Sequence, residues 1–209
     1  MKRYQGTETD NPQAKSRGFT LIEMAVILVI LGLIAGSVLP LLETVIKKDK
    51  ISETKSIVKT ARDELVGYIL LNKKLPADQS AFLSQIGHTV DAWQQNLFYI
   101  PTWDSNATIN LCSMNSTKFS VCRNGNCSAS KIPNILFLVG SKGGNLNRQT
   151  ESPANRDADT TDGEVRIYNY SVKVDGYSSG SDPNRPQDNY DDMVEFVQLN
   201  EIKSKLTCP

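Results

Sequence analysis

The chain has 209 residues, and 23 lysines and arginines balance 23 aspartates and glutamates. This length is sufficient for one globular domain with an appendage. A formal net charge of zero gives no overall basic footprint of the kind that nucleic-acid binding needs, so we expect no nucleic-acid partner.

Residues 1–18 read as a leader ahead of the folded part of the chain. They are polar, contain Pro12 and show neither helical nor strand periodicity. Their basic residues outnumber their acidic ones, and two of them, Lys15 and Arg17, lie close to the segment that follows. The simplest interpretation is a disordered cytoplasmic leader.

Residues 19–42 form an apolar run in which Glu23 is the only ionisable residue. A helix of this length rises about 36 Å, enough to cross a hydrocarbon core of roughly 30 Å. Lys15 and Arg17 precede the run, so the positive-inside rule predicts a single pass with the N-terminus in the cytoplasm and the rest of the chain outside.

Two ordinary kinds of membrane-targeting segment fit this run poorly. A cleaved signal peptide has a shorter apolar stretch, followed by a small-residue cleavage site that is not found cleanly here. A plain signal anchor fits the length but leaves Glu23 unexplained. A carboxylate near the start of a membrane helix costs on the order of 1–3 kcal/mol and normally marks a function.

The sequence Arg17-Gly18-Phe19-Thr20-Leu21-Ile22-Glu23 resembles the cleavage and N-methylation motif of type IV pilins and type II secretion pseudopilins. In that family a membrane prepilin peptidase cuts after the glycine, and the new N-terminal amine is methylated. The resemblance implies cleavage after Gly18, methylation of Phe19, and Glu23 as the fifth residue of the mature chain. It also implies other pilin or pseudopilin subunits, an inner-membrane assembly platform and a cytoplasmic ATPase as partners.

Glu23 has no expected partner within its own helix. When subunits stack, the amine of Phe19 in one subunit can lie beside the Glu23 carboxylate of its neighbour, which pairs two charges that are costly alone in apolar surroundings. That pairing favours one axial register, so we predict an assembly role for Glu23. Pro40, where many family members also have proline, is predicted to kink the helix.

Residues 43–75 continue the helix as an amphipathic segment. An apolar stripe follows helical spacing, and Pro76 sets the latest plausible end. We therefore predict one helix over about residues 20–73, which we call the spine helix. The stripe consists of Ile51, Val58, Ala61, Leu65 and Ile69.

Residues 76–209 are predicted to form an extracytoplasmic domain rich in β-strands. Short β-type runs occupy residues 96–100, 118–121, 135–139, 165–174 and 193–197, separated by long turn-rich stretches at 140–164 and 175–192. The expected fold is α+β, with the spine helix packed on a small antiparallel β-sheet domain with long loops, as in the pilin fold.

Asp91-Ala92-Trp93 resembles the D-x-W-G strand opening of major pseudopilins, but Gln94 replaces the glycine. The simplest role for this segment is structural, with Trp93 and Tyr99 anchoring the sheet to the spine helix.

Four cysteines, Cys112, Cys122, Cys127 and Cys208, predict two disulfides in a domain outside the cytoplasm. Three pairings are possible. We favour Cys122–Cys127, which flank a tight-turn sequence, together with Cys112–Cys208. A zinc site is disfavoured because the set contains only one close cysteine pair.

The resemblance also suggests a metal, because major pseudopilins hold calcium in a loop late in the chain. The corresponding interval here ends at Asp191 and Asp192, which are the candidate calcium ligands. The interval is longer than in those relatives and does not align with their ligands, so a solvated, capping acidic turn is the alternative. We expect no other cofactor.

Nothing in the sequence supports catalysis. His88 is the only histidine, and no G-x-S-x-G elbow accompanies it. The favoured function is a structural subunit of a type IV pilus or a periplasmic type II secretion pseudopilus, inserted in a bacterial inner membrane before assembly. The alternatives are a membrane-anchored adhesin or binding module outside any filament, and an anchored enzyme with a pocket around His88.

Overall fold

The computed structural model describes residues 18, 20–102, 111–124, 127–146, 148–150, 163–170, 172 and 189–206. Within the helix, the side chains of residues 37, 38 and 40 are not described. The chain divides into two compact units, Met1–Ile46 and Lys47–Pro209, and we describe each by itself.

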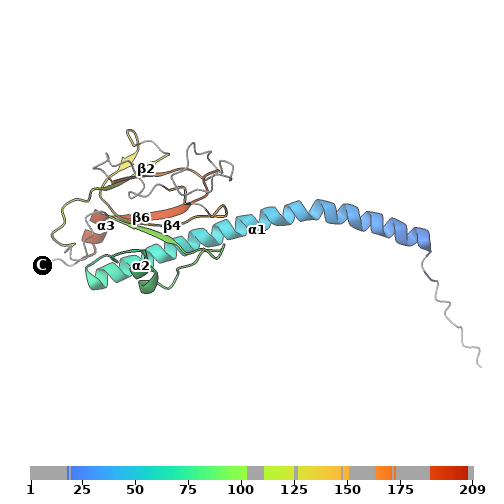
Figure 1. Cartoon of the computed structure of the whole chain (residues 1–209), viewed down its shortest axis with the longest axis horizontal. Coiled ribbons are helices and arrows are strands. Elements are labelled where there is room, and N and C mark those ends of the chain that lie inside the picture. The colour runs from blue at the N-terminus through green and yellow to red at the C-terminus, as the bar shows by residue number, and fades with distance from the viewer. Residues whose placement is uncertain are drawn as a thin grey trace, which may run out of the picture. The chain divides into compact units, whose positions relative to one another are not determined.

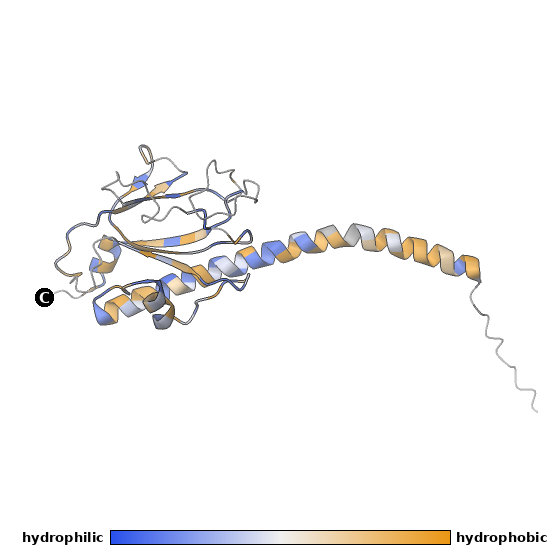
Figure 2. Cartoon of the chain, in the orientation of Figure 1, coloured by the Kyte–Doolittle hydropathy of each residue, from blue (hydrophilic) through white to orange (hydrophobic). Residues whose placement is uncertain are grey.

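Helix α1, Leu21–Asn72, confirms the predicted spine helix. The part of α1 in the first unit is apolar almost throughout, as its colouring in Figure 2 shows. α1 runs through Pro40 without a break, and a kink there stays a prediction.

In the second unit, the predicted apolar stripe of α1 is buried. Val58, Ala61, Leu65 and Ile69 are at most 1% exposed, while Ile51 is only half-buried. Their spacing of three and four residues places them on one face of the helix, and this face packs against a sheet.

That sheet has the strand order β1-β4-β6 and is antiparallel throughout. β1 spans Phe98–Pro101, β4 spans Ile135–Ser141 and β6 spans Met193–Gln198. Gly140 lies at its centre, where an added Cβ would come within 2.5 Å of the Phe98 ring and 2.7 Å of Val194. Only glycine fits this position without displacing its neighbours.

A second sheet has the order β3-β2-β5, with β2 at Phe119–Arg123, β3 at Lys131–Ile132 and β5 at Gly163–Ile167. β2 and β3 pair in the predicted antiparallel sense, but β2 and β5 are parallel. β5 also ends at Ile167, earlier than the predicted strand over residues 165–174.

β4 is the central strand of the second unit, and all seven of its residues are buried. Leu136, Phe137 and Val139 join the core formed with α1. Ile135 and Leu138 belong instead to a second core with residues of β2 and β5. In Figure 1, β4 and β6 accordingly lie between the second half of α1 and β2. The layers are helix, sheet and sheet, which confirms the α+β class.

Two short helices, which the sequence did not predict, complete the second unit. α2, Gln79–Gln85, is capped by Asp78, whose side chain accepts a hydrogen bond from the Ala81 N–H at 2.7 Å. Phe82 of α2 stacks on Tyr99, with 4.9 Å between ring centroids. α3, Leu199–Lys203, is tied to α1 by an ion pair of 2.6 Å between Arg62 and Glu201.

Asp91 organises the turn that precedes β1. Its buried carboxylate accepts hydrogen bonds from the backbone N–H groups of Trp93 and Gln95, both at 2.9 Å, and from the Ser141 hydroxyl at 2.5 Å. Gln94 has a φ of +62°. That left-handed backbone favours glycine, the residue that the D-x-W-G pattern has at this position.

The loop after α2 is fastened to α1 through Glu64. Its Oε2 accepts the backbone N–H groups of Gly87 at 2.8 Å and His88 at 3.1 Å, and its Oε1 lies 2.6 Å from His88 Nδ1. Burial acts to raise the pKa of Glu64, but the hydrogen bonds from His88 and Gly87 outweigh it and lower the pKa below its ordinary value. The only histidine therefore holds a loop in place.

We expect Gln94→Gly to raise the free energy of unfolding by about 0.5–1 kcal/mol. A left-handed backbone costs an L-residue about 1–2 kcal/mol, and glycine avoids this cost. The greater conformational entropy of glycine in the unfolded chain cancels roughly half of that gain. Denaturant unfolding of the full chain in detergent measures the change. Gln95→Gly is the control, and it should lose about 0.5–1 kcal/mol. Equal losses in both variants would contradict the strain at Gln94.

We expect Glu64→Gln to lower the free energy of unfolding by about 1–2 kcal/mol at pH 7, because charged acceptors form the stronger hydrogen bonds. The pKa of Glu64 is lowered in the folded state, so its stabilisation is complete above the unfolded-state pKa and is lost as pH falls through the folded-state pKa. The gap between wild type and variant should therefore close below about pH 4. Glu53→Gln, at an exposed site on the same helix, should change stability by less than about 0.5 kcal/mol.

Candidate functional site

The start of α1 carries a reciprocal hydrogen-bond arrangement between Thr20 and Glu23. The Thr20 backbone N–H and hydroxyl both donate to Glu23 Oε2, at 2.8 Å and 2.9 Å. In return, the Glu23 N–H donates to the Thr20 hydroxyl oxygen at 3.3 Å. This is a capping box, in which two side chains satisfy backbone donors that the first turn of a helix leaves open.

The expectation that Glu23 has no partner within its own helix is therefore wrong. The T-x-x-E spacing of Thr20 and Glu23 is the sequence signal that could have revealed the capping box. Glu23 also lies in the first turn, where the helix dipole favours negative charge. The carboxylate consequently has a stable position in a single copy of the chain.

Gly18, the predicted last residue of the leader, is exposed. No described atom lies within 4 Å of where a Cβ would be, so the described structure gives no steric reason for glycine at this position. Phe19, the predicted methylation site, lies outside the described residues.

The N-terminal half of α1 presents an apolar surface on every side. All described side chains from Leu21 to Ile46 are exposed, and no described residue of the first unit covers them. Among the described helices, α1 is the one that is long and apolar enough to cross a membrane, judged by length and composition. A helix that is apolar all round needs lipid or other protein around it. The large exposed side chains include Leu21, Ile22, Leu28, Val29, Leu33, Ile34, Leu39 and Leu41.

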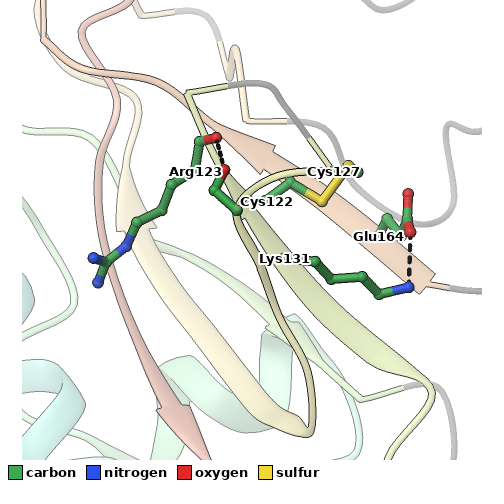
Figure 3. The surroundings of a disulfide bond; sticks show 6 residues. Cys122, Arg123, Cys127, Lys131 and Glu164 are labelled. Atoms are coloured by element: carbon green, nitrogen blue, oxygen red, sulfur yellow. Dashed lines mark hydrogen bonds and ion pairs between the residues drawn. A yellow bond between two sulfur atoms is a disulfide. The ribbon is translucent and has the colours of Figure 1, made fainter.

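The predicted Cys122–Cys127 disulfide is confirmed, with 4.7 Å between the two Cα atoms. It closes the turn between β2 and β3 beside an ion pair of 2.9 Å between Lys131 and Glu164, as Figure 3 shows. Cys112 is also disulfide-bonded. Cys208 lies outside the described residues, so its pairing with Cys112 stays a prediction.

Cys122, Cys127 and Glu164 form the one group of three possible metal-ligating side chains found among the described residues. The two sulfur atoms are bonded to each other, so neither is available as a thiolate ligand in this state.

The structure brings together the two ends of the interval that suggested calcium. Asp191 accepts the Asn145 backbone N–H at 2.9 Å, and Asp192 accepts the Thr150 N–H at 2.5 Å. Burial raises the pKa of Asp192 to about 7. Calcium takes six to eight oxygen ligands, and no third acidic side chain joins these two in the described part of the chain. Calcium binding by Asp191 and Asp192 stays a prediction.

Comparison with known proteins bears directly on the N-terminal segment. Residues 13–39 match the family model described as the prokaryotic N-terminal methylation motif. No curated protein and no solved structure matches the chain. The match covers the Gly18–Glu23 segment and the first part of α1, and it confirms that the chain carries the motif of type IV prepilins and pseudopilins. That motif belongs to structural proteins and not to enzymes.

We expect replacement of both Cys122 and Cys127 by alanine to lower the free energy of unfolding by about 2 kcal/mol, because the bridge restricts the unfolded chain. Denaturant unfolding under oxidising and reducing conditions measures the change. The gap between wild type and variant should close in reductant, which removes the bridge from the wild type. A gap that persists would indicate lost packing at buried Cys122 instead of a lost cross-link.

Proposed function

We propose that this chain is a structural subunit of a type IV pilus or a type II secretion pseudopilus. It is synthesised as a prepilin, cut after Gly18 and polymerised through α1. The observation that carries the proposal is the N-terminal methylation motif at residues 13–39, which leads directly into an apolar helix that its own unit leaves uncovered.

The position of Gly18 supports processing by a prepilin peptidase. The residue is exposed and lies two residues ahead of the capping box at Thr20, so the peptide bond to Phe19 precedes the helix. The cut leaves Phe19 as a cationic N-terminus, and methylation of its amine preserves that charge. The helix start does not depend on the leader, because Thr20 and Glu23 both stay in the mature chain.

The exposed apolar part of α1 supports two successive environments. Before assembly, a bilayer covers this surface, with the β-rich unit outside the cytoplasm of a bacterial inner membrane. After assembly, the helices of neighbouring subunits replace the lipid. The Phe19 amine of one subunit then pairs with the Glu23 carboxylate of the next, and an inner-membrane assembly platform guides this transfer.

The proposal covers both kinds of filament. The Asp91 turn resembles the strand opening of major pseudopilins, whereas the disulfides and long loops are more typical of a type IV pilus subunit. Both sets of features lie in the second unit, away from the motif on which the proposal rests.

We expect Glu23→Ala to permit membrane insertion and cleavage but to abolish incorporation into filaments, because the neighbour's amine loses its anionic partner. The mass of the processed chain measures cleavage, and the sheared or sedimented filament fraction measures assembly. Glu43→Ala, which removes an exposed carboxylate further along α1, is the matched control and should assemble like the wild type.

A different result would support a membrane-anchored adhesin or binding module. In that case the wild type forms no filament, and Glu23→Ala keeps the normal location and the normal surface activity. In that case α1 would act only as an anchor, and its N-terminal carboxylate would be dispensable.

A further inference from the structure

Five of the six charged side chains of α1 between residues 48 and 59 lie on two flanks of opposite sign, and the sixth, Lys50, lies about 60° beyond Glu53. Lys48, Lys55 and Lys59 form the basic flank, and Asp49 and Glu53 form the acidic flank. At about 100° per residue, each set lies within about 40° of rotation, and the two sets are about 120° apart. All five residues lie in the second unit, beside the buried stripe.

None of these five side chains has a partner in the described structure. All are exposed, and no ion pair or hydrogen bond joins any of them to another described residue. Three and five residues beyond Lys59 on α1, by contrast, Arg62 pairs with Glu201 and Glu64 pairs with His88. Within the part of the chain that the structure describes, nothing occupies the two flanks, which leaves them open to a partner outside the chain.

Each flank places like charges at a spacing that destabilises a helix. Asp49 and Glu53 are four residues apart, as are Lys55 and Lys59. Opposite charges at position 50, three residues before Glu53, and at position 63, four residues after Lys59, offset part of this repulsion. An oppositely charged partner outside the chain would relieve the remainder.

The basic flank also borders an open cavity. Lys55 and Lys59 line a cavity of about 540 Å³, whose other wall includes Tyr168, Tyr170 and Glu195. Glu195 forms no ion pair with either lysine in the described structure. The lysines can therefore turn toward a partner that approaches this side of α1.

We infer that the basic flank of one copy binds the acidic flank of a second copy of the chain. The inference rests on the proposed function, in which membrane insertion fixes neighbouring helices parallel. Lys55 follows Asp49 by six residues, and Lys59 follows Glu53 by six residues. Six residues span about 9 Å of helix, so parallel neighbours offset by that distance form both ion pairs at once.

Cysteine cross-linking of the full-length chain in membranes and filaments tests the offset. A chain that carries both Asp49→Cys and Lys55→Cys should form a ladder of covalent multimers after mild oxidation, seen on non-reducing gels. Each single variant should form no ladder, because it lacks the second cysteine. The matched pair Asp49→Cys with Lys59→Cys should form none either, because ten residues span about 15 Å and not the roughly 9 Å of the proposed offset. A ladder from the matched pair alone would overturn the six-residue offset.

Charge reversal tests the attraction itself. Asp49→Lys with Glu53→Lys should reduce the assembled fraction by about tenfold or more, and so should Lys55→Glu with Lys59→Glu. The chain with all four changes should assemble nearly as well as the wild type, because the pairs are restored with opposite signs. Unchanged thermal unfolding of each variant would show that the fold is retained.

The outcomes separate this inference from the proposed function. If the wild type forms filaments, both charge-reversed chains assemble fully and no cross-linked ladder appears, the ion pairs are refuted. The proposed filament function is then retained. A wild-type chain that is cleaved but never multimerises would overturn both.

Discussion

The apolar surface of the first half of α1 is the constraint on which the rest of this protein depends. No described residue of its own unit covers that surface, and a helix that is apolar all round needs lipid or other protein around it. The second half of the same helix has its own cover, because Val58, Leu65 and Ile69 are buried under a sheet. One continuous helix therefore joins an apolar segment to a folded, more polar unit.

The second unit holds its half of α1 by two different means. Apolar packing is central, since β4 is buried on both faces and belongs to two cores. Two polar contacts add to this packing. Glu64 holds the loop at His88 by hydrogen bonds, and Arg62 holds α3 by its ion pair with Glu201. These ties use charges near the end of α1. The charges of the two flanks nearer its middle have no such partner among the described residues, and this contrast distinguishes a structural charge from one that we infer to act in assembly.

Local signals made much of this fold predictable. The spine helix follows from a long apolar run and a stripe with helical spacing, and the Cys122–Cys127 bridge follows from two cysteines flanking a turn. α3 was missed because five residues are too few to show periodicity, and the parallel pairing of β2 with β5 was missed because it joins segments far apart in the chain. At the candidate site, the cleavage motif is recognisable from the sequence, and the T-x-x-E spacing of Thr20 and Glu23 is sufficient to predict the capping box. The left-handed backbone of Gln94 could not be predicted from glutamine itself.

Under the proposed function, the capping box at Thr20 has a consequence for quality control in a growing polymer. Its hydrogen bonds do not involve the leader, so an uncut precursor and a mature subunit begin the helix in the same way. The backbone conformation at this helix start therefore does not distinguish an unprocessed chain from a processed one. Discrimination falls to a single chemical difference, the positive amine that cleavage creates on Phe19. The Glu23 carboxylate, already occupied by Thr20, changes partner only when that amine arrives, so premature addition is disfavoured by chemistry and not by a steric block.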